Sequence, residues 1–522
     1  MTKRQYAALF LGACFLYLPG VFWGLPEANA PDRVVPFGPD ELAPLPPAAE
    51  LYNVLIARQP PFNPQYPLFH YFVEGLFIGP FLLWTWLTGG LIEPRNVYPF
   101  GLVDPVASLR AMTIVGRIPS VLAGAGVVTA SAWAGSHLWG TAAGLLAGLF
   151  VALQYSMGYY SRTANVDVPA LLWISLGMCV FCAILRDRWT MRRGLQFSLF
   201  AALAVATKDA SYAAFVFPSV ALAWWNCRGP HPSQEQGRNK EILIATGTAA
   251  GAYVLACGVL LHPGRYLDHL RFISHGSPSA AYFSVPATLA GYSEITVKSG
   301  LHILDIMGFP MLLLAVYGLA ASFRRGHGEL VLIGVLPATL LFIIYPTRLT
   351  VLRFLIPSCW ILGLFAARGA ALLWERSRPW GAALTVITIA WAFAGQADLL
   401  WQSYFDTRYA AAEWFAAHAR PGDRVVYFKS PEKLPHLPAG VVSVKSFGET
   451  STLASRPEFV IHVPWETEEV SGRNVPPALL TALQDGSAGY RVAARWEPRS
   501  FFSRRLLSVV NPHITVFERA DR

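Results

Sequence analysis

The sequence predicts a mainly α-helical, polytopic membrane protein with a small soluble α/β domain at its C-terminus. Of its 522 residues, 54% are hydrophobic and 14% are charged, whereas charged residues make up about a quarter of an ordinary soluble protein. Apolar stretches long enough to cross a bilayer, about 20 residues each, recur from the N-terminus to residue 401. After residue 403 the pattern changes to alternating helix-like and strand-like segments.

The apolar stretches predict about eleven transmembrane helices. The first, 5–24, lies between "MTKR" and Ala28-Asn29-Ala30, so it also resembles a signal peptide. We interpret it as an uncleaved helix because its apolar run is longer and more aromatic than a usual signal sequence. The other predicted spans are 110–134, 139–158, 166–185, 193–208, 210–226, 241–261, 300–322, 329–346, 351–373 and 380–401.

One further apolar stretch, 67–90, is ambiguous, and the basic clusters between the later spans decide its interpretation. Clusters such as "RDRWTMRR" (186–193) and "ERSR" (375–378) should be cytoplasmic under the positive-inside rule. They are cytoplasmic only if 67–90 is re-entrant or interfacial, with Gly79-Pro80 as a plausible break point. The sequence therefore predicts a multi-pass protein of the cell inner (plasma) membrane.

This topology divides the chain into a membrane domain, 1–403, and an extracytoplasmic α/β domain, 404–522. The second domain begins with the helix-like "DTRYAAAEWFAAHARPGD". The strand-like runs "RVVYF", "GVVSV", "EFVIHV", "YRVAARW" and "HITVFER" follow. This domain carries no nucleotide-binding loop and no metal-ligand signature in its sequence.

Charge and cysteine usage disfavour two other classes of protein. The net charge of +9 arises from short basic clusters between apolar runs, which is typical of cytoplasmic loops and not of a nucleic-acid-binding face. All six cysteines lie in or beside apolar runs, so no disulfide framework is indicated. Cys179 and Cys182 form a C-x-x-C, but within a predicted span, which favours buried small side chains over a redox or zinc site.

Ionisable residues gather on the predicted outer face. Asp40 and Glu41 lie in the first external loop (25–66), and Lys208 lies at a helix end. Each could be ordinary: a solvated acid, a loop ion pair, or a cation reaching the interface. However, positive charges are disfavoured in short external loops, and ionisable groups at membrane depth are usually functional. The candidate site residues are Asp40, Glu41, Tyr66, His70, Arg162, Asp167, Lys208, Arg348 and Arg353.

These segments resemble the GT-C glycosyltransferases, specifically the superfamily of protein O-mannosyltransferases (dolichyl-phosphate-mannose-protein mannosyltransferase-like) and lipid A aminoarabinose transferases. The resemblance covers nearly the whole chain, in the family's order. It rests on the acidic pair Asp40-Glu41 and on "YPLFHYF", "SRTANVDVPALLW", "ATKDASYAAFVFP", "RLTVLRFLIP" and "DTRYAAAEWFAAHARPGDRVVYF".

The sequence departs from that pattern in two places. Members of the aminoarabinose branch carry a Lys before a Pro-Pro, where this chain has Arg58 and Gln59, so phosphate contacts are not carried over there. The segment 67–90 and the loop 91–109 are also longer than usual, so the acceptor is not inferred from the relatives.

The resemblance implies a polyprenyl-phosphate-linked sugar as donor and a lipid, glycan or protein hydroxyl as acceptor, with inversion at the sugar. A carboxylate can take the acceptor's proton, and we expect Asp40 to be this base, with Glu41 beside it. Lys208, Arg348 and Arg353 are the candidates for binding the donor phosphate. Residues expected to orient the sugar or acceptor are Tyr66, His70, Arg162 and Asp167. No cofactor is required, but a divalent cation is possible through carboxylate ligands.

Three alternatives stay open. A lipid-linked saccharide ligase or polymerase would use a similar donor and differ only in its acceptor. A membrane transporter would place its charges near the bilayer midplane, whereas here they lie at helix ends on one side. An inert scaffold would carry the same residues without activity. The sequence does not identify the sugar, the acceptor, the lipid length or the oligomeric state.

Overall fold

The computed structural model describes residues 1–59, 62–227, 232–275, 284–325, 328–428, 430–446, 451–464, 476–502 and 507–522. Pro60 and Pro61, which follow Arg58-Gln59, lie outside the described residues. The chain forms two compact units. The helical unit comprises Met1–Pro19, Pro46–Phe77 and Arg117–Gln396, and the mixed unit comprises Gly20–Leu45, Ile78–Gly116 and Ala397–Arg522.

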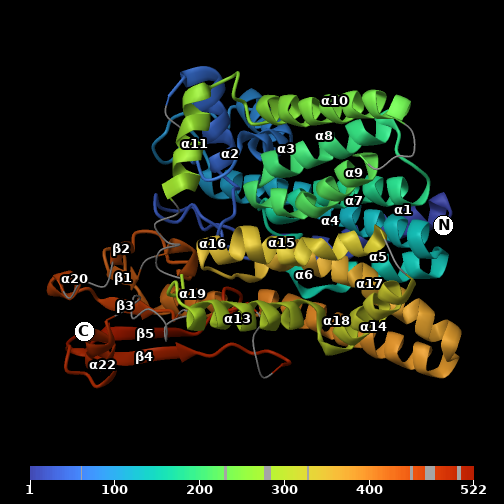
Figure 1. Ribbon diagram of the computed structural model, residues 1–522. Coiled ribbons are helices and arrows are strands. Elements are labelled where there is room, and N and C mark those ends of the chain that lie inside the picture. Colours follow the sequence, from blue (N-terminus) through green and yellow to red (C-terminus); the bar gives the residue numbers. More distant parts are fainter. Residues whose placement is uncertain are drawn as a thin grey trace. The chain divides into compact units, whose positions relative to one another are not determined.

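Long apolar helices build most of the helical unit. Helices α7, α8 and α10 pack side by side (Figure 1), and α14 and α5 pack on α17. The centre of α17 is buried, and its Trp360 Nε1 donates a hydrogen bond to Ser131 Oγ in α4 at 2.7 Å. The helices from the N-terminus onward are α1 (Lys3–Tyr17), α2 (Pro46–Tyr52), α3 (Leu68–Leu87), α4 (Pro105–Trp139), α5 (Thr141–Leu153), α6 (Tyr155–Tyr160), α7 (Asp167–Arg186), α8 (Met191–Thr207), α9 (Tyr212–Cys227), α10 (Pro232–Ala256), α11 (Pro263–His275), α13 (Leu289–Met307), α14 (Phe309–Arg325), α15 (Val335–Thr339), α16 (Tyr345–Thr347), α17 (Ile356–Arg376) and α18 (Arg378–Tyr404).

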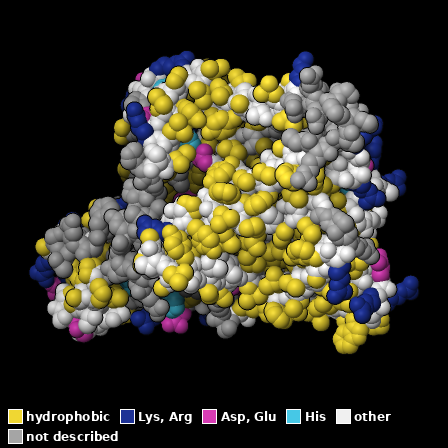
Figure 2. Space-filling view, in the orientation of Figure 1, with side chains coloured by type: hydrophobic (Ala, Val, Ile, Leu, Met, Phe, Trp, Pro, Cys, Tyr) yellow, Lys and Arg dark blue, Asp and Glu magenta, His cyan; other side chains and the backbone are white. Residues whose placement is uncertain are grey.

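Seven helices within the described residues are long and apolar enough to cross a membrane, or eight if the bent pair α13–α14 counts as one span. The chain is therefore a multi-pass membrane protein, and hydrophobic side chains cover much of the visible face of its helices (Figure 2). The predicted spans 139–158, 193–208 and 210–226 fall on shorter helices: α5 has 13 residues, α8 has 17 and α9 has 16. The seven are Lys3–Phe22, Leu68–Leu87, Pro105–Trp139, Asp167–Arg186, Gly328–Thr347, Leu352–Arg376 and Arg378–His418.

The predicted span 300–322 is also not straight, because α13 and α14 meet at an angle of 104°. Gly308 separates the two helices with a φ of +73°, a conformation that glycine adopts without strain. A Cβ at this position would lie 2.5 Å from Trp391, so the bend also depends on the close approach of that ring.

Helix α3 corrects the prediction of a break at Gly79-Pro80. It is one continuous helix of 20 residues with Pro80 inside it, and the flanking helical hydrogen bonds hold it together despite the missing N–H. Its exposed large side chains include Leu76, Trp84 and Trp86. Tryptophan is enriched where a helix meets the membrane–water interface.

Contacts in the mixed unit bring the segment after α3 next to the first external loop. Tyr98, beyond the end of α3, donates a hydrogen bond from its OH to Ala28 O at 2.8 Å, and Arg110 pairs with Glu27 at 3.2 Å. Between Ala28 and α3, the described helical segments are α2 and a five-residue π-helical turn, Asn53–Ala57. Together they are too short to cross a core of about 30 Å. By its length and composition α3 is also one of the seven candidate spans, and its interfacial placement stays a prediction.

The C-terminal part forms a small mixed sheet, as predicted. Its strand order is β2-β1-β3-β5-β4, in which β1 pairs in parallel with β2 and β3, whereas β5 pairs antiparallel with β3 and β4. Helix α19 (Thr407–His418) covers one face through Phe415, and α22 (Pro477–Gln484) covers the other through Leu483. The strands are β1 (Arg424–Phe428), β2 (Val442–Ser446), β3 (Phe459–His462), β4 (Tyr490–Trp496) and β5 (Ile514–Arg519). The domain boundary at 403/404 stays a prediction.

Candidate functional site

Three of the predicted site residues, Asp167, Lys208 and Arg353, line one pocket of the helical unit. They come from the start of α7, the end of α8 and the turn before α17. The rest of the lining is mostly apolar. It consists of Ala170, Ile174, Ala210, Ser211, Ala214, Thr339, Ile343, Phe354, Ile356 and Pro357.

Asp167 is fixed by its place as the first residue of α7, where the helix dipole favours a negative charge. Its backbone N–H donates to Asn165 Oδ1 at 2.9 Å, which orders the turn before the helix. The side chain is only 2% exposed. Its Oδ1 accepts a hydrogen bond from Lys208, whereas Oδ2 has no hydrogen-bond partner among the described residues.

Lys208 ends helix α8, and its extended backbone turns the chain into the short 3-10 helix Asp209–Ser211. Its Nζ lies 2.5 Å from Asp167 Oδ1 and 5.4 Å from the centre of the Phe354 ring. The carboxylate and the face of the ring both attract the ammonium. The ammonium is thus held in place and still faces the pocket.

Arg353 brings a second cation to this pocket from the 3-10 helix Leu352–Leu355, where it is half-buried beside Phe354. An ammonium and a guanidinium in one largely apolar pocket suit an anion with several oxygens, because both groups make charge-assisted hydrogen bonds. Together with the Asp167 carboxylate, these two cations are the charged groups in the lining of this pocket.

Four other predicted residues of the helical unit do not line this pocket. Arg348 ends α16 with a φ of +54°, and its carbonyl accepts a hydrogen bond from Val285 N at 2.9 Å. Arg162 is buried and donates to Leu16 O at 3.0 Å. Tyr66 and His70 are buried near α3, where His70 Nε2 lies 3.2 Å from Glu74 Oε1.

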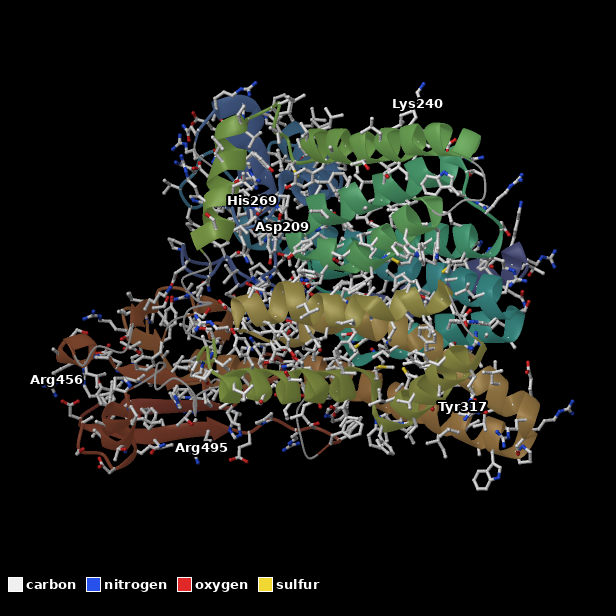
Figure 3. All side chains as sticks on the ribbon, viewed as in Figure 1. Asp209, Lys240, His269, Tyr317, Arg456 and Arg495 are labelled. Carbon is white, nitrogen blue, oxygen red and sulfur yellow. The ribbon has the colours of Figure 1, made fainter. Side chains whose placement is uncertain are left out.

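A buried ionic cluster was missed by the sequence analysis. Arg265 and Glu50 form an ion pair of 2.6 Å with side chains 1% and 0% exposed. One turn along α11, His269 Nε2 lies 3.2 Å from Asp209 Oδ1, and Figure 3 shows these two side chains near each other. The signal was present, because Arg265 and His269 are spaced as i and i+4 and share a helix face. It was overlooked because Arg265 and His269 lie between the predicted spans 241–261 and 300–322, outside any apolar stretch.

Asp40 and Glu41 belong to the mixed unit. Asp40 is exposed and lies in a turn with a φ of +60°, a left-handed conformation that aspartate tolerates better than most residues. Glu41 folds back over Gly38, since a Cβ at Gly38 would lie 2.1 Å from Glu41 Oε1. The two neighbouring acids therefore point differently, and the exposed one is the predicted base.

The C-terminal domain holds the loop that carries Asp40. Arg408 of α19 is 2% exposed and pairs with Asp406 at 2.7 Å. Its guanidinium lies 3.8 Å from the centre of the Phe37 ring and donates to Glu432 O at 2.7 Å. Asp406 in turn accepts from Trp23 Nε1 at 3.0 Å. Phe37 and Trp23 of the first loop are thus bound to the start of α19.

The same loop reaches into the C-terminal domain through a second arginine. Arg33 is buried and donates to Leu437 O at 3.0 Å and Pro438 O at 3.1 Å. Within the loop, Phe37 N donates to Gly24 O at 2.8 Å. Two buried guanidinium groups, one from each partner segment, therefore fix the loop from Trp23 to Phe37.

Binding of a divalent cation stays a prediction from the sequence. Within the part of the chain that the structure describes, no three His, Cys, Asp or Glu side chains are grouped as metal ligands. The three carboxylates considered from the sequence, Asp40, Glu41 and Asp167, are divided between the two units.

Comparison with known proteins gives likenesses only to solved structures. No family model matches the sequence, and no curated protein matches it. ArnT from Cupriavidus metallidurans, bound to undecaprenyl phosphate, is similar over 99% of this chain and 98% of its own, with 11% identity and a TM-score of 0.48. The Archaeoglobus fulgidus oligosaccharyltransferase is similar over 88% of this chain and 69% of its own, with 11% identity and a TM-score of 0.41. The mycobacterial arabinofuranosyltransferase AftD has 15% identity and a TM-score of 0.43 over 99% of this chain and 42% of its own.

Proposed function

We propose that the protein is a membrane glycosyltransferase that moves a sugar from a polyprenyl-phosphate donor to an acceptor hydroxyl on the extracytoplasmic face. The observation that carries this proposal is the pocket in which Lys208 and Arg353 meet among apolar helices. A lipid phosphate suits such a pocket, because an ammonium and a guanidinium both make charge-assisted hydrogen bonds to phosphate oxygens. The order of the motifs in the sequence supports the same reaction.

The reaction requires a base and a site for the leaving group. The acceptor oxygen forms a bond to the anomeric carbon, and its proton passes to Asp40. The bond from that carbon to the phosphate oxygen breaks, and its electron pair stays on the lipid phosphate. Lys208 and Arg353 stabilise that charge, and Asp167 holds Lys208 in position. Attack opposite the leaving group inverts the sugar.

The phosphate site is tested by binding of undecaprenyl phosphate to the purified full chain. Lys208→Gln and Arg353→Gln should each weaken binding about tenfold or more, since a hydrogen bond to a charged group contributes about 1.5–3 kcal/mol. Arg348→Gln is the matched control, because Arg348 does not line the pocket. The proposal is contradicted if all three variants bind undecaprenyl phosphate with the same affinity as one another.

The base is tested separately by following transfer. Asp40→Asn should abolish transfer while undecaprenyl phosphate still binds, because the amide cannot accept the proton. The sugar and the acceptor for this assay are identified by mass spectrometry, which compares glycolipids, glycans and glycoproteins in cells with and without the protein. An Asn variant that turns over normally would exclude Asp40 as the base.

A further inference from the structure

Asp209 and His269 form a polar site in an otherwise apolar surface. Figure 3 shows the two side chains close together, with His269 Nε2 3.2 Å from Asp209 Oδ1. The Asp209 side chain is 30% exposed and that of His269 is fully buried. An ionisable group on a membrane-embedded face costs free energy and usually has a function.

The surroundings hold the Asp209 carboxylate in one orientation. His269 Nδ1 donates to Pro64 O at 2.7 Å, which turns Nε2 toward Asp209 Oδ1 at 3.2 Å. Helix α11 is itself anchored by Arg265, which donates to Glu50 at 2.6 Å and to Tyr66 O at 2.7 Å. Among the described residues, His269 is the hydrogen-bond partner of this carboxylate, so Oδ2 can still accept from a ligand.

The position of Asp209 restricts what that ligand can be. It follows Lys208 directly, yet it does not line the pocket that Lys208 and Arg353 share. Within that pocket the carboxylate of Asp167 already pairs with Lys208. A carboxylate outside the pocket suits the uncharged part of a ligand whose phosphate binds at Lys208. In a polyprenyl-phosphate sugar, the uncharged polar part is the sugar, which is bonded directly to the phosphate. Sugar hydroxyls donate hydrogen bonds, and a carboxylate only accepts them.

We propose that Asp209, oriented by His269, is a subsite that accepts hydrogen bonds from the hydroxyls of the transferred sugar and so selects the donor. This inference rests on the proposed function, because it takes the donor phosphate to bind at Lys208. A sugar that lacks the matching hydroxyl leaves this carboxylate without its hydrogen-bond donor, so the site binds that sugar less tightly.

The test compares bare undecaprenyl phosphate with undecaprenyl phosphate carrying mannose, glucose, galactose or arabinose, bound to the full chain in lipid nanodiscs. The wild type should bind at least one sugar-bearing lipid more tightly than the bare lipid. Asp209→Leu should remove this gain. The affinity for the sugar-bearing lipid should fall about 10- to 100-fold, as expected for the loss of a hydrogen bond to a charged group, while the affinity for the bare lipid stays the same. Asp209→Asn should retain part of the gain, because an amide can donate to His269 and accept from the sugar.

The matched control is Asp268→Asn, which removes an exposed carboxylate next to His269 that pairs with Arg271 at 2.9 Å. It should leave every affinity unchanged. The subsite is refuted if no sugar improves binding to the wild type, or if Asp209→Leu changes the bare and sugar-bearing lipids equally. It is also refuted if Asp209→Leu stops transfer without changing the donor affinities. If Lys208→Gln binds the bare lipid as tightly as the wild type does, the proposed function is refuted instead.

Discussion

The charged residues of the helical unit are held by partners before any ligand binds. Asp167 holds Lys208, Glu50 holds Arg265, and Asp209 holds His269. Removing charges from water is expensive, and a pair recovers that cost only when its geometry is good and its other hydrogen bonds are made. We infer that these pairs serve orientation more than stability, since they fix cations and acids where a lipid phosphate and a sugar would meet.

The pair Glu50–Arg265 allows this cost to be measured. Glu50 Oε2 also accepts from Phe62 N at 2.7 Å and Asn63 N at 2.9 Å, so Glu50→Ala leaves a buried guanidinium and two N–H groups without their acceptor. We expect the free energy of unfolding to fall by about 3–5 kcal/mol. Glu294→Ala is the control, since the Glu294–Lys298 pair is 47% and 43% exposed and should contribute less than about 1 kcal/mol. Chemical denaturation in detergent measures both, and equal losses would contradict the expectation.

At the scale of elements, the docking of the first loop on α19 depends on one glycine. Gly24 has a φ of +58°, and a Cβ there would lie 2.3 Å from Phe37 Cβ. Gly24→Ala should therefore displace Phe37 from Arg408 and disturb Asp40, three residues further on. Because small misplacements of a reacting group can cost about 100-fold, we expect transfer to fall at least about tenfold while undecaprenyl phosphate still binds.

The control for this variant is Gly12→Ala in α1, where a Cβ would meet nothing within 4 Å. Alanine is also the better helix former, so this change should leave transfer intact. Full activity in Gly24→Ala would show that the docked loop does not position the base.

The elements also show what the sequence could and could not predict. Strand-like runs such as "RVVYF" became strands because alternation and β-branched side chains are local signals. Helix α11 was missed because its sequence is charged and lies between apolar runs, so hydropathy alone marks it as a loop. Asp167, Lys208 and Arg353 were predicted to lie on one face, and they line one pocket, but no local pattern could separate them from Arg348. That distinction depends on how the turns before α17 pack, which is a tertiary property.

For the whole molecule, the contacts between distant segments decide which parts share one side of the membrane. Trp23 contacts Asp406, and Tyr98 contacts Ala28, all within the mixed unit. The first loop, the segment after α3 and the C-terminal domain therefore lie on the same side. Hydropathy could not establish this for α3, because its length and composition alone are those of a membrane span.

Cysteine labelling tests this arrangement in intact cells. Ile92 follows α3 and is 74% exposed, and Val35 in the first loop is 38% exposed. With a membrane-impermeant maleimide, Ile92→Cys and Val35→Cys should be labelled alike, and the positive-inside rule predicts labelling from outside. Arg188→Cys, in an exposed position of the basic cluster 186–193, should be labelled only after permeabilisation. If Ile92→Cys instead behaves like Arg188→Cys, α3 crosses the bilayer. The basic clusters and the proposed base Asp40 can then no longer be assigned to opposite faces by charge.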